Sequence, residues 1–174
     1  GIAPLQPTLD SIAALKDKTD LARALGETIR ADVDPLNATN YHTEHLFGIF
    51  VSQGLSDPAH NTAYLLQGGL GMPDRDYYVS KDPAMTEIRA KYKTYIAALL
   101  TQAKIPDADK KAAAIYALEE KIARAHAPIA ETDDVHKANN PWPVAEFAKK
   151  APGLDWATFL KAAGLDGQAT ITAW

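Results

Sequence analysis

Residues 70–78 read Leu70-Gly71-Met72-Pro73-Asp74-Arg75-Asp76-Tyr77-Tyr78, and this stretch is the most informative one in the chain. Glycine permits positive φ and close backbone approach, whereas proline fixes its own φ and pushes the preceding residue toward an extended conformation. The stretch therefore predicts an ordered turn between a strand and a helix, with the two tyrosines as its anchors.

Two apolar stretches upstream of this turn predict an antiparallel β-hairpin. Residues 46–51 and 62–67 are rich in aromatic and aliphatic side chains, and the connection between them carries the turn signal Ser56-Asp57-Pro58. The C-terminal residues 169–174 also have strand character. Because an isolated hairpin is only marginally stable, we expect it to pack on helices or to pair with another strand.

Two amphipathic segments downstream of the turn predict a helix hairpin. The first begins with Asp82 as N-cap and Pro83 at the first helical position, and its apolar residues recur at spacings of three and four up to position 103. The second covers residues 108–126, with Asp107 as the expected cap. The short connection predicts antiparallel neighbours. The residues expected to pack together are Ile88, Tyr92, Tyr95, Leu99, Ile115, Leu118 and Ile122.

Shorter helices are predicted near both ends, and residues 32–45 and 127–142 are predicted to be loops. The expected starts of these helices are Thr8, Thr19 or Asp20, Pro143 and Asp155. Their expected inward faces include Leu21, Leu25, Thr28, Ile29, Phe159, Leu160 and Ala163. The predicted fold class is mainly α: a helix hairpin plus shorter helices with a small antiparallel β-hairpin. We expect residues 1–174 to form a single unit.

The composition excludes several classes of protein. A net charge of −4 at pH 7 argues against a nucleic-acid binder, which usually carries a basic face. No apolar run approaches the ~20 residues that span a bilayer. The sequence has no cysteine, which excludes disulfides, thiolate catalysis and cysteine metal sites.

Two short segments contain residues that could hold a metal ion. They are His42-Thr43-Glu44-His45 and the group Asp133, Asp134 and His136. Both lie in predicted loops, and the first lacks the third protein ligand that a zinc site needs. A solvated polar loop is the favoured interpretation of each, so the sequence predicts no metal-binding and no catalytic residue in this segment.

The remaining titratable residues also favour structural roles. Glu119 and Glu120 are adjacent on a predicted helix, so their side chains point about 100° apart and do not share a site. We expect one of them to be solvated and the other to pair with Arg124. His60 and His126 are single histidines, for which capping or surface roles are expected.

Arg75 has two competing interpretations. Its guanidinium could bind a substrate carboxylate in a bidentate manner. Alternatively, it could lock the turn through Asp74, Asp76 and backbone carbonyls, and this structural role is the favoured one.

The Leu-Gly-x-Pro-Asp-Arg-Asp-Tyr-Tyr pattern of residues 70–78 closely resembles a segment of the neprilysin-type zinc metallopeptidases. Two weaker similarities support it: residues 117–123 resemble a leucine-glutamate-x-x-isoleucine-alanine stretch, and residues 140–147 an asparagine-proline step before a short helix. The resemblance implies that this chain is the central part of the family's N-terminal helical domain. The His-Glu-x-x-His zinc motif of the family's C-terminal domain does not occur in this sequence.

The resemblance implies a division of labour within a larger protein. This segment would restrict access to an active-site cavity, and a C-terminal catalytic domain of the same protein would hold zinc and hydrolyse peptides. The lack of cysteine is similar to bacterial members, which implies a periplasmic or secreted parent. The chain ends on Trp174 within an apolar pattern, so we expect a piece of a longer protein. The alternative hypothesis is a free-standing helical module that binds a protein partner without catalysis.

Overall fold

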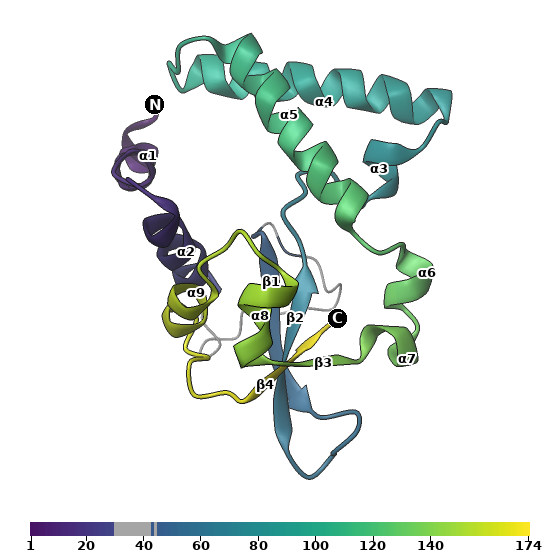
Figure 1. The fold of residues 1–174 in the computed structure, drawn as a ribbon. Coiled ribbons are helices and arrows are strands. Elements are labelled where there is room, and N and C mark those ends of the chain that lie inside the picture. Colours follow the sequence, from purple (N-terminus) through teal and green to yellow (C-terminus); the bar gives the residue numbers. More distant parts are fainter. Residues whose placement is uncertain (30–42, 44) are drawn as a thin grey trace. The chain divides into compact units, whose positions relative to one another are not determined.

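A computed structural model describes residues 1–29, 43 and 45–174 of the chain (Figure 1). The described residues form a mainly α structure with one small sheet, as predicted. They divide into two compact units. Unit 1 comprises Gly1–Ala14 and Leu70–Pro128, and unit 2 comprises Leu15–Gly69 and Ile129–Trp174.

Unit 2 contains a four-stranded sheet with the order β1-β2-β4-β3. β1 (Phe47–Gln53) and β2 (Asn61–Gln67) form the predicted antiparallel hairpin, in which Phe47 lies opposite Gln67. β4 (Thr170–Ala173) confirms the predicted C-terminal strand, and it pairs in parallel with β2. β3 (Asn140–Pro143) completes the sheet by antiparallel pairing with β4.

The prediction of a loop over residues 127–142 is wrong. This segment contains α6 (Ile129–Thr132), α7 (Val135–Ala138) and most of β3. Single-turn helices are too short to show a hydrophobic period, and α7 begins because the Asp134 carboxylate accepts a hydrogen bond from the His136 N–H. The two prolines of β3 obscured the strand, because proline is tolerated only at sheet edges, where β3 lies.

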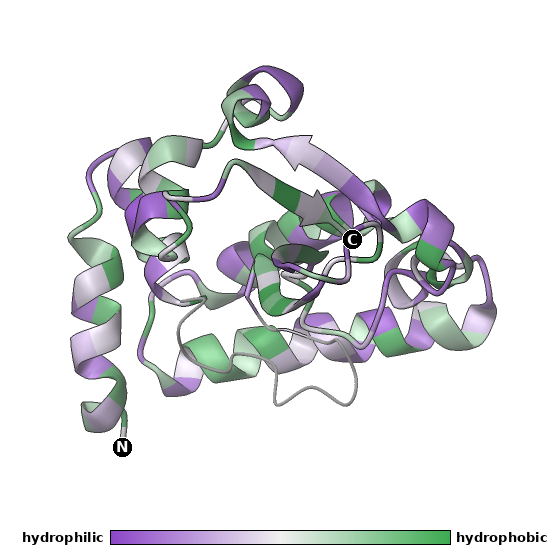
Figure 2. Cartoon of the chain, turned by 90° about the horizontal axis from the view of Figure 1, so that it is seen from below, coloured by the Kyte–Doolittle hydropathy of each residue, from purple (hydrophilic) through white to green (hydrophobic). Residues whose placement is uncertain are grey.

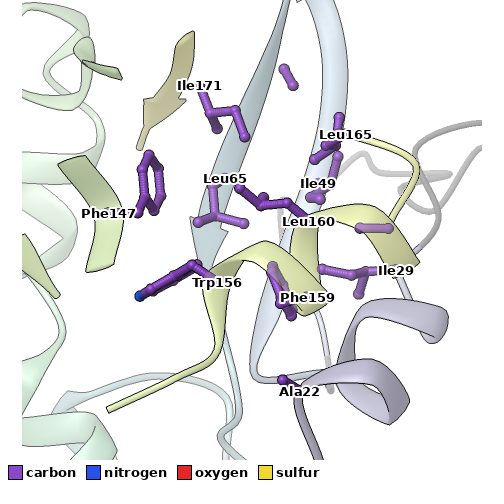
Figure 3. Close-up of a cluster of buried hydrophobic side chains, with 12 residues drawn as sticks. Ala22, Ile29, Ile49, Leu65, Phe147, Trp156, Phe159, Leu160, Leu165 and Ile171 are labelled. Carbon is purple, nitrogen blue, oxygen red and sulfur yellow. The ribbon is translucent and has the colours of Figure 1, made fainter. Parts of the chain in front are cut away.

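The core of unit 2 lies between the sheet and the helices of its two chain segments (Figure 3). α9 (Trp156–Ala162) supplies Phe159 and Leu160, which lie with Ile49 and Leu65 of the hairpin. The Asp155 carboxylate caps α9 as predicted, by accepting from the Thr158 N–H. A 3₁₀ turn (Val144–Glu146) and α8 (Phe147–Lys150) follow β3, so the short helix predicted here is present, and Pro143 is the N-cap before it as well as the last residue of β3.

α2 (Lys18–Glu27) differs from the prediction in its cap and in its buried face. Asp17, not Thr19 or Asp20, is its N-cap. Ile29 is buried and Leu25 packs against the core as predicted, but Leu21 is 43% exposed and Thr28 is exposed, and the buried positions of the helix itself are Ala22 and Gly26. The reason is close packing against α9: a Cβ at Gly26 would collide with the Phe159 carbonyl oxygen and lie 2.8 Å from the Ala162 Cβ.

Unit 1 begins with a 3₁₀ turn (Ala3–Leu5) and α1 (Gln6–Ala13), so the first helix starts two residues before the expected Thr8 cap. It continues with α3 (Asp76–Val79), α4 (Pro83–Gln102) and α5 (Ala108–Ala125). Asp82 caps α4 as predicted. Asp107 precedes α5 with φ 58° and its side chain makes no capping hydrogen bond, contrary to expectation. Figure 2 shows hydrophobic and hydrophilic residues mixed along the helices.

The predicted packing of the helix hairpin is wrong in detail. α4 and α5 contact each other, but Tyr95, Leu99 and Leu118 are 58%, 45% and 60% exposed. Ile88, Tyr92 and Ile122 pack against the buried cluster as predicted, but the buried positions of the two helices are Ile96, Ala112, Tyr116 and Ala123. α3 packs against both helices, which diverge from their connecting loop (Figure 1), so the apolar stripes face each other over only part of their length.

Among the described residues, no helix is both long and apolar enough to cross a bilayer.

Candidate functional site around the Gly71–Tyr78 turn

The segment from Gly71 to Tyr78 is ordered by local hydrogen bonds at the start of α3. The Asp74 carboxylate accepts from the Asp76 N–H at 2.7 Å, and the Tyr78 N–H donates to the Arg75 carbonyl at 3.0 Å. These bonds satisfy N–H groups that a four-residue helix would otherwise leave unpaired. The sequence prediction of an ordered turn here is confirmed.

Tyr78 anchors the turn to α5. Its side chain is 2% exposed, and its hydroxyl donates to Glu119 Oε2 at 2.6 Å while accepting from the Met72 N–H at 3.0 Å. One hydroxyl therefore joins two segments 41 residues apart.

Tyr92 of α4 binds the same carboxylate, with its hydroxyl 2.9 Å from Glu119 Oε2. Gly71 lies directly against this contact, because a Cβ at position 71 would collide with the Tyr92 hydroxyl. The glycine is required at this position by close approach. The Tyr78–Glu119–Tyr92 network thus holds the turn, α4 and α5 together.

Burial, followed by the hydrogen bond to Glu119, raises the pKa of Tyr78 and of Tyr92 above its ordinary value. Both hydroxyls are protonated at neutral pH, as an ordinary tyrosine is, and both donate to Glu119.

The arginine that ties α3 to α4 is Arg89, which sequence reasoning missed. Its Nη1 donates to the carbonyls of Tyr77 at 3.1 Å and Ser80 at 3.0 Å, and its Nη2 donates to Thr86 Oγ1 at 2.8 Å. The guanidinium thus satisfies carbonyls at the end of α3, where a helix lacks intrahelical donors. The sequence offered only a weak signal, namely that a short helix before Asp82-Pro83 needs such a partner.

Arg75 makes fewer contacts than the predicted turn lock, in which both Asp74 and Asp76 would bind its guanidinium. Its Nη1 lies 3.1 Å from Asp76 Oδ1, and the two side chains are 30% and 70% exposed. The Asp74 carboxylate binds the Asp76 backbone instead. The Arg75 Nε is buried without a hydrogen-bond partner within the described part of the chain. Its role in structure or in substrate binding stays a prediction.

A pocket of about 320 Å³ opens beside the turn. Its apolar lining comes from the turn, α3 and α4, namely Met72, Pro73, Tyr77, Ile88, Tyr92 and Tyr95. Tyr77 therefore lines a pocket in addition to packing against the buried cluster of unit 1.

Among the described residues, the other candidates do not come together in a site. His60 pairs with Asp57 at 2.7 Å on an exposed loop, and this hydrogen bond lowers the pKa of Asp57. Asp134 caps α7. His42 and Glu44 lie outside the described residues. Within the described residues, no group of three His, Cys, Asp or Glu side chains could hold a metal ion, so this part of the chain does not fit a zinc site.

Glu119 and Glu120 point to different partners, as expected from their spacing. Glu120 pairs with Arg124 at 2.5 Å, whereas Glu119 accepts hydrogen bonds from two tyrosines. The expectation that the second glutamate is simply solvated was wrong, because two tyrosines from distant positions reach it.

Comparison with known proteins identifies the family. The model of the N-terminal region of peptidase family M13 matches residues 1–173. The chain is 26% identical over 124 residues to endothelin-converting enzyme 1 of Bos taurus and 25% identical over 118 residues to neprilysin-3 of Drosophila melanogaster. These matches cover 70% and 67% of this chain but only 16% and 15% of the relatives.

Solved structures agree. The zinc metalloprotease Zmp1 of Mycobacterium tuberculosis, in complex with an inhibitor, superposes with a TM-score of 0.83 at 28% identity, over 99% of this chain and 25% of Zmp1. PepO from Lactobacillus rhamnosis shares the fold, with a TM-score of 0.62 at 17% identity. The chain belongs to the N-terminal region of peptidase family M13, and the resemblance to the neprilysin-type peptidases is confirmed.

Proposed function

We propose that the chain is the non-catalytic N-terminal segment of a zinc-dependent metalloendopeptidase and that it restricts the access of peptides to the active-site cavity. The observation that carries this proposal is the match of residues 1–173 to the N-terminal family model. The similarity to Zmp1 supports it, since nearly all of this chain corresponds to a quarter of that metalloprotease.

The zinc of the parent enzyme is held, in this proposal, by a catalytic domain beyond the segment. Catalytic zinc supplies an activated water and polarises the scissile carbonyl. The described residues contain no group of three His, Cys, Asp or Glu side chains that could hold this ion by itself. Their contribution is steric, because they select which polypeptides reach the cavity.

Exposed apolar side chains support contact with another part of the parent. Leu5 and Ile12 of the N-terminal helices are 57% and 59% exposed, and Leu99 and Leu118 belong to the same class. A contiguous patch of exposed apolar groups marks an interaction surface, and these side chains are candidates for such a surface. We assign them to contacts with the catalytic domain of the same protein, and we place that protein in the bacterial periplasm or outside the cell.

The test compares the 174-residue chain with a longer protein that includes the downstream catalytic domain. After purification without chelators, the longer protein should retain about one zinc per chain and cleave peptides, whereas the segment should do neither. One tightly held zinc per segment would overturn the proposal.

A second comparison tests access. In the longer protein, Leu118→Glu should raise cleavage of an unfolded protein relative to a short peptide, because a charge disfavours a buried contact. Lys121→Glu, also on the exposed surface of α5, is the control and should leave the ratio unchanged. Equal ratios in all three proteins would contradict a role in restricting access.

A further inference from the structure

The pocket beside the Gly71–Tyr78 turn has the size and chemistry of a side-chain binding site. Its volume of about 320 Å³ lies at the lower end of the range for ligand pockets. Its walls are three tyrosines, Ile88, Met72 and Pro73. The rings of Tyr92 and Tyr95 lie side by side, with centroids 6.4 Å apart. Aromatic walls of this kind favour a bulky apolar side chain.

Hydrogen bonds hold part of the pocket wall in place, at Tyr92, Met72 and the helix that carries Tyr77. Tyr92 is held by Glu119, and the Met72 N–H donates to the Tyr78 hydroxyl. Arg89 ties the end of α3, which carries Tyr77, to α4. A preformed pocket costs little entropy to fill.

The mouth of the pocket is charged and open to solvent. Lys91 is part of the lining, its side chain is 75% exposed, and its Nζ lies 2.7 Å from Oε1 of Glu87, which is 68% exposed. An exposed lysine beside an apolar pocket matches an occupant that carries a carboxylate next to an apolar side chain.

We propose that this pocket binds an unfolded peptide through one bulky apolar side chain, with a neighbouring carboxylate of the peptide paired to Lys91. Lys91 can exchange Glu87 for the incoming carboxylate because both partners are exposed and their pair is weak. The inference rests on the proposed function in one respect, since it takes the peptide to be a substrate of the parent. The pocket then acts as a recognition site in addition to the active-site cavity.

The test is NMR titration of the 174-residue chain with the blocked peptide Gly-Gly-Phe-Asp-Gly-Gly. Saturable shifts should appear at the amides of residues 71, 72, 74–77 and 88–95. A peptide with Ala in place of Phe should bind about tenfold more weakly, and one with Lys in place of Asp about threefold more weakly.

Two variants and a matched control locate the site. Tyr95→Ser should weaken binding of the Phe-Asp peptide about tenfold, and Lys91→Glu should remove the preference for Asp over Lys. Tyr95 is 58% exposed, so its replacement should leave the fold intact. Leu99→Ser, one turn further along α4 and 45% exposed, does not line the pocket and should bind as the wild type does.

Four results would overturn the proposal: absence of saturable shifts, shifts confined to unit 2, equal losses in Tyr95→Ser and Leu99→Ser, or self-association of the chain through Tyr95. Loss of the peptide site in the longer protein would also overturn it, because the catalytic domain would then cover the pocket. The titration measures binding by the segment without zinc, so its failure is distinct from failure of the longer protein to cleave peptides.

Discussion

Unit 2 is held together by apolar burial, whereas unit 1 depends on a smaller apolar cluster and a polar network. Among the described residues, the buried cluster of unit 2 has twelve members, including Trp156, Phe159 and Phe147, whose rings meet edge to face. The cluster of unit 1 has five members. Hydrogen bonds also hold unit 1 together: Tyr78 and Tyr92 donate to Glu119, and Arg89 donates to the end of α3.

The difference shows how a family-specific turn can be positioned without a large core. Apolar packing is non-directional, so it tolerates many arrangements of similar volume. Hydrogen bonds to a carboxylate are directional, and they place the Gly71–Tyr78 backbone against α4 and α5. Unit 1 thereby keeps a defined pocket while leaving apolar side chains exposed.

The largest expected effect is in the core of unit 2. Phe159→Ala should lower the free energy of unfolding by about 3–5 kcal/mol, because the ring is 1% exposed. All three tryptophans, Trp142, Trp156 and Trp174, lie in unit 2, so tryptophan fluorescence in urea reports on this unit alone. Leu21→Ala, at a position 43% exposed, is the control and should shift the midpoint little. Similar losses for both variants would contradict the assigned core.

The next effect tests the polar network of unit 1. Glu119→Ala removes the acceptor of two tyrosine hydroxyls and should cost about 1.5–3 kcal/mol. Glu120→Ala, the neighbouring residue, loses only a surface pair with Arg124 and should cost about 0–1 kcal/mol. Helical circular dichroism in urea is the measurement, because the long helices α4 and α5 belong to unit 1. Equal costs would mean that the network contributes nothing beyond a surface ion pair.

The same network predicts a response to alkaline pH. The pKa of Tyr78 is raised above 10.0 in the folded state, first by burial and then by the bond to Glu119. Its contribution to stability is therefore fully present below pH 10.0 and is lost as the pH rises through the folded-state pKa. Tyr78→Phe should be less stable at neutral pH but should lose less stability above pH 10.0. Urea midpoints measured at several pH values check this, and parallel profiles would contradict it.

Local signals in the sequence predicted much of this fold. Asp82-Pro83 and Asp155 mark true helix starts, and the two apolar strands pair as the predicted antiparallel hairpin. Each of these features is decided by neighbouring residues. The turn at residues 70–78 was also identified, because glycine and proline restrict the backbone locally.

The missing features depend on residues far apart in the sequence. β3 forms because Trp142 pairs with Ile171, and the sequence around Trp142 does not indicate a partner 29 residues away. The role of Glu119 depends on Tyr78, 41 residues away. Helical periodicity identified an apolar stripe on α4, but it could not show that α3 packs against both long helices. The pocket was missed for the same reason.

A smaller effect is expected at Arg75. The guanidinium pairs with an exposed carboxylate, so Arg75→Ala should cost about 0–1 kcal/mol in the helical circular dichroism transition of unit 1. Arg89→Ala should cost more, because Arg89 donates to two carbonyls and a hydroxyl. In a longer, active protein, Arg75→Ala should leave the KM for peptides unchanged. A folded variant with a sharply raised KM would make Arg75 a substrate-binding residue.

The smallest effect is expected at the exposed apolar side chains of α4 and α5, in contrast to the buried Ile96 of α4. Leu99→Ala and Leu118→Ala should each change the stability of the 174-residue chain by about 0.5 kcal/mol or less, because both side chains are largely exposed. Ile96→Ala, on the same helix as Leu99, should cost about 2–5 kcal/mol, because its side chain is 7% exposed. In a longer protein with its catalytic domain, the cost at Leu118 should rise if that domain covers α5, since the same methyl groups are then removed from a buried contact. An unchanged small cost there would show that this face of α5 remains open to solvent, and the domain contact would have to lie elsewhere on the segment.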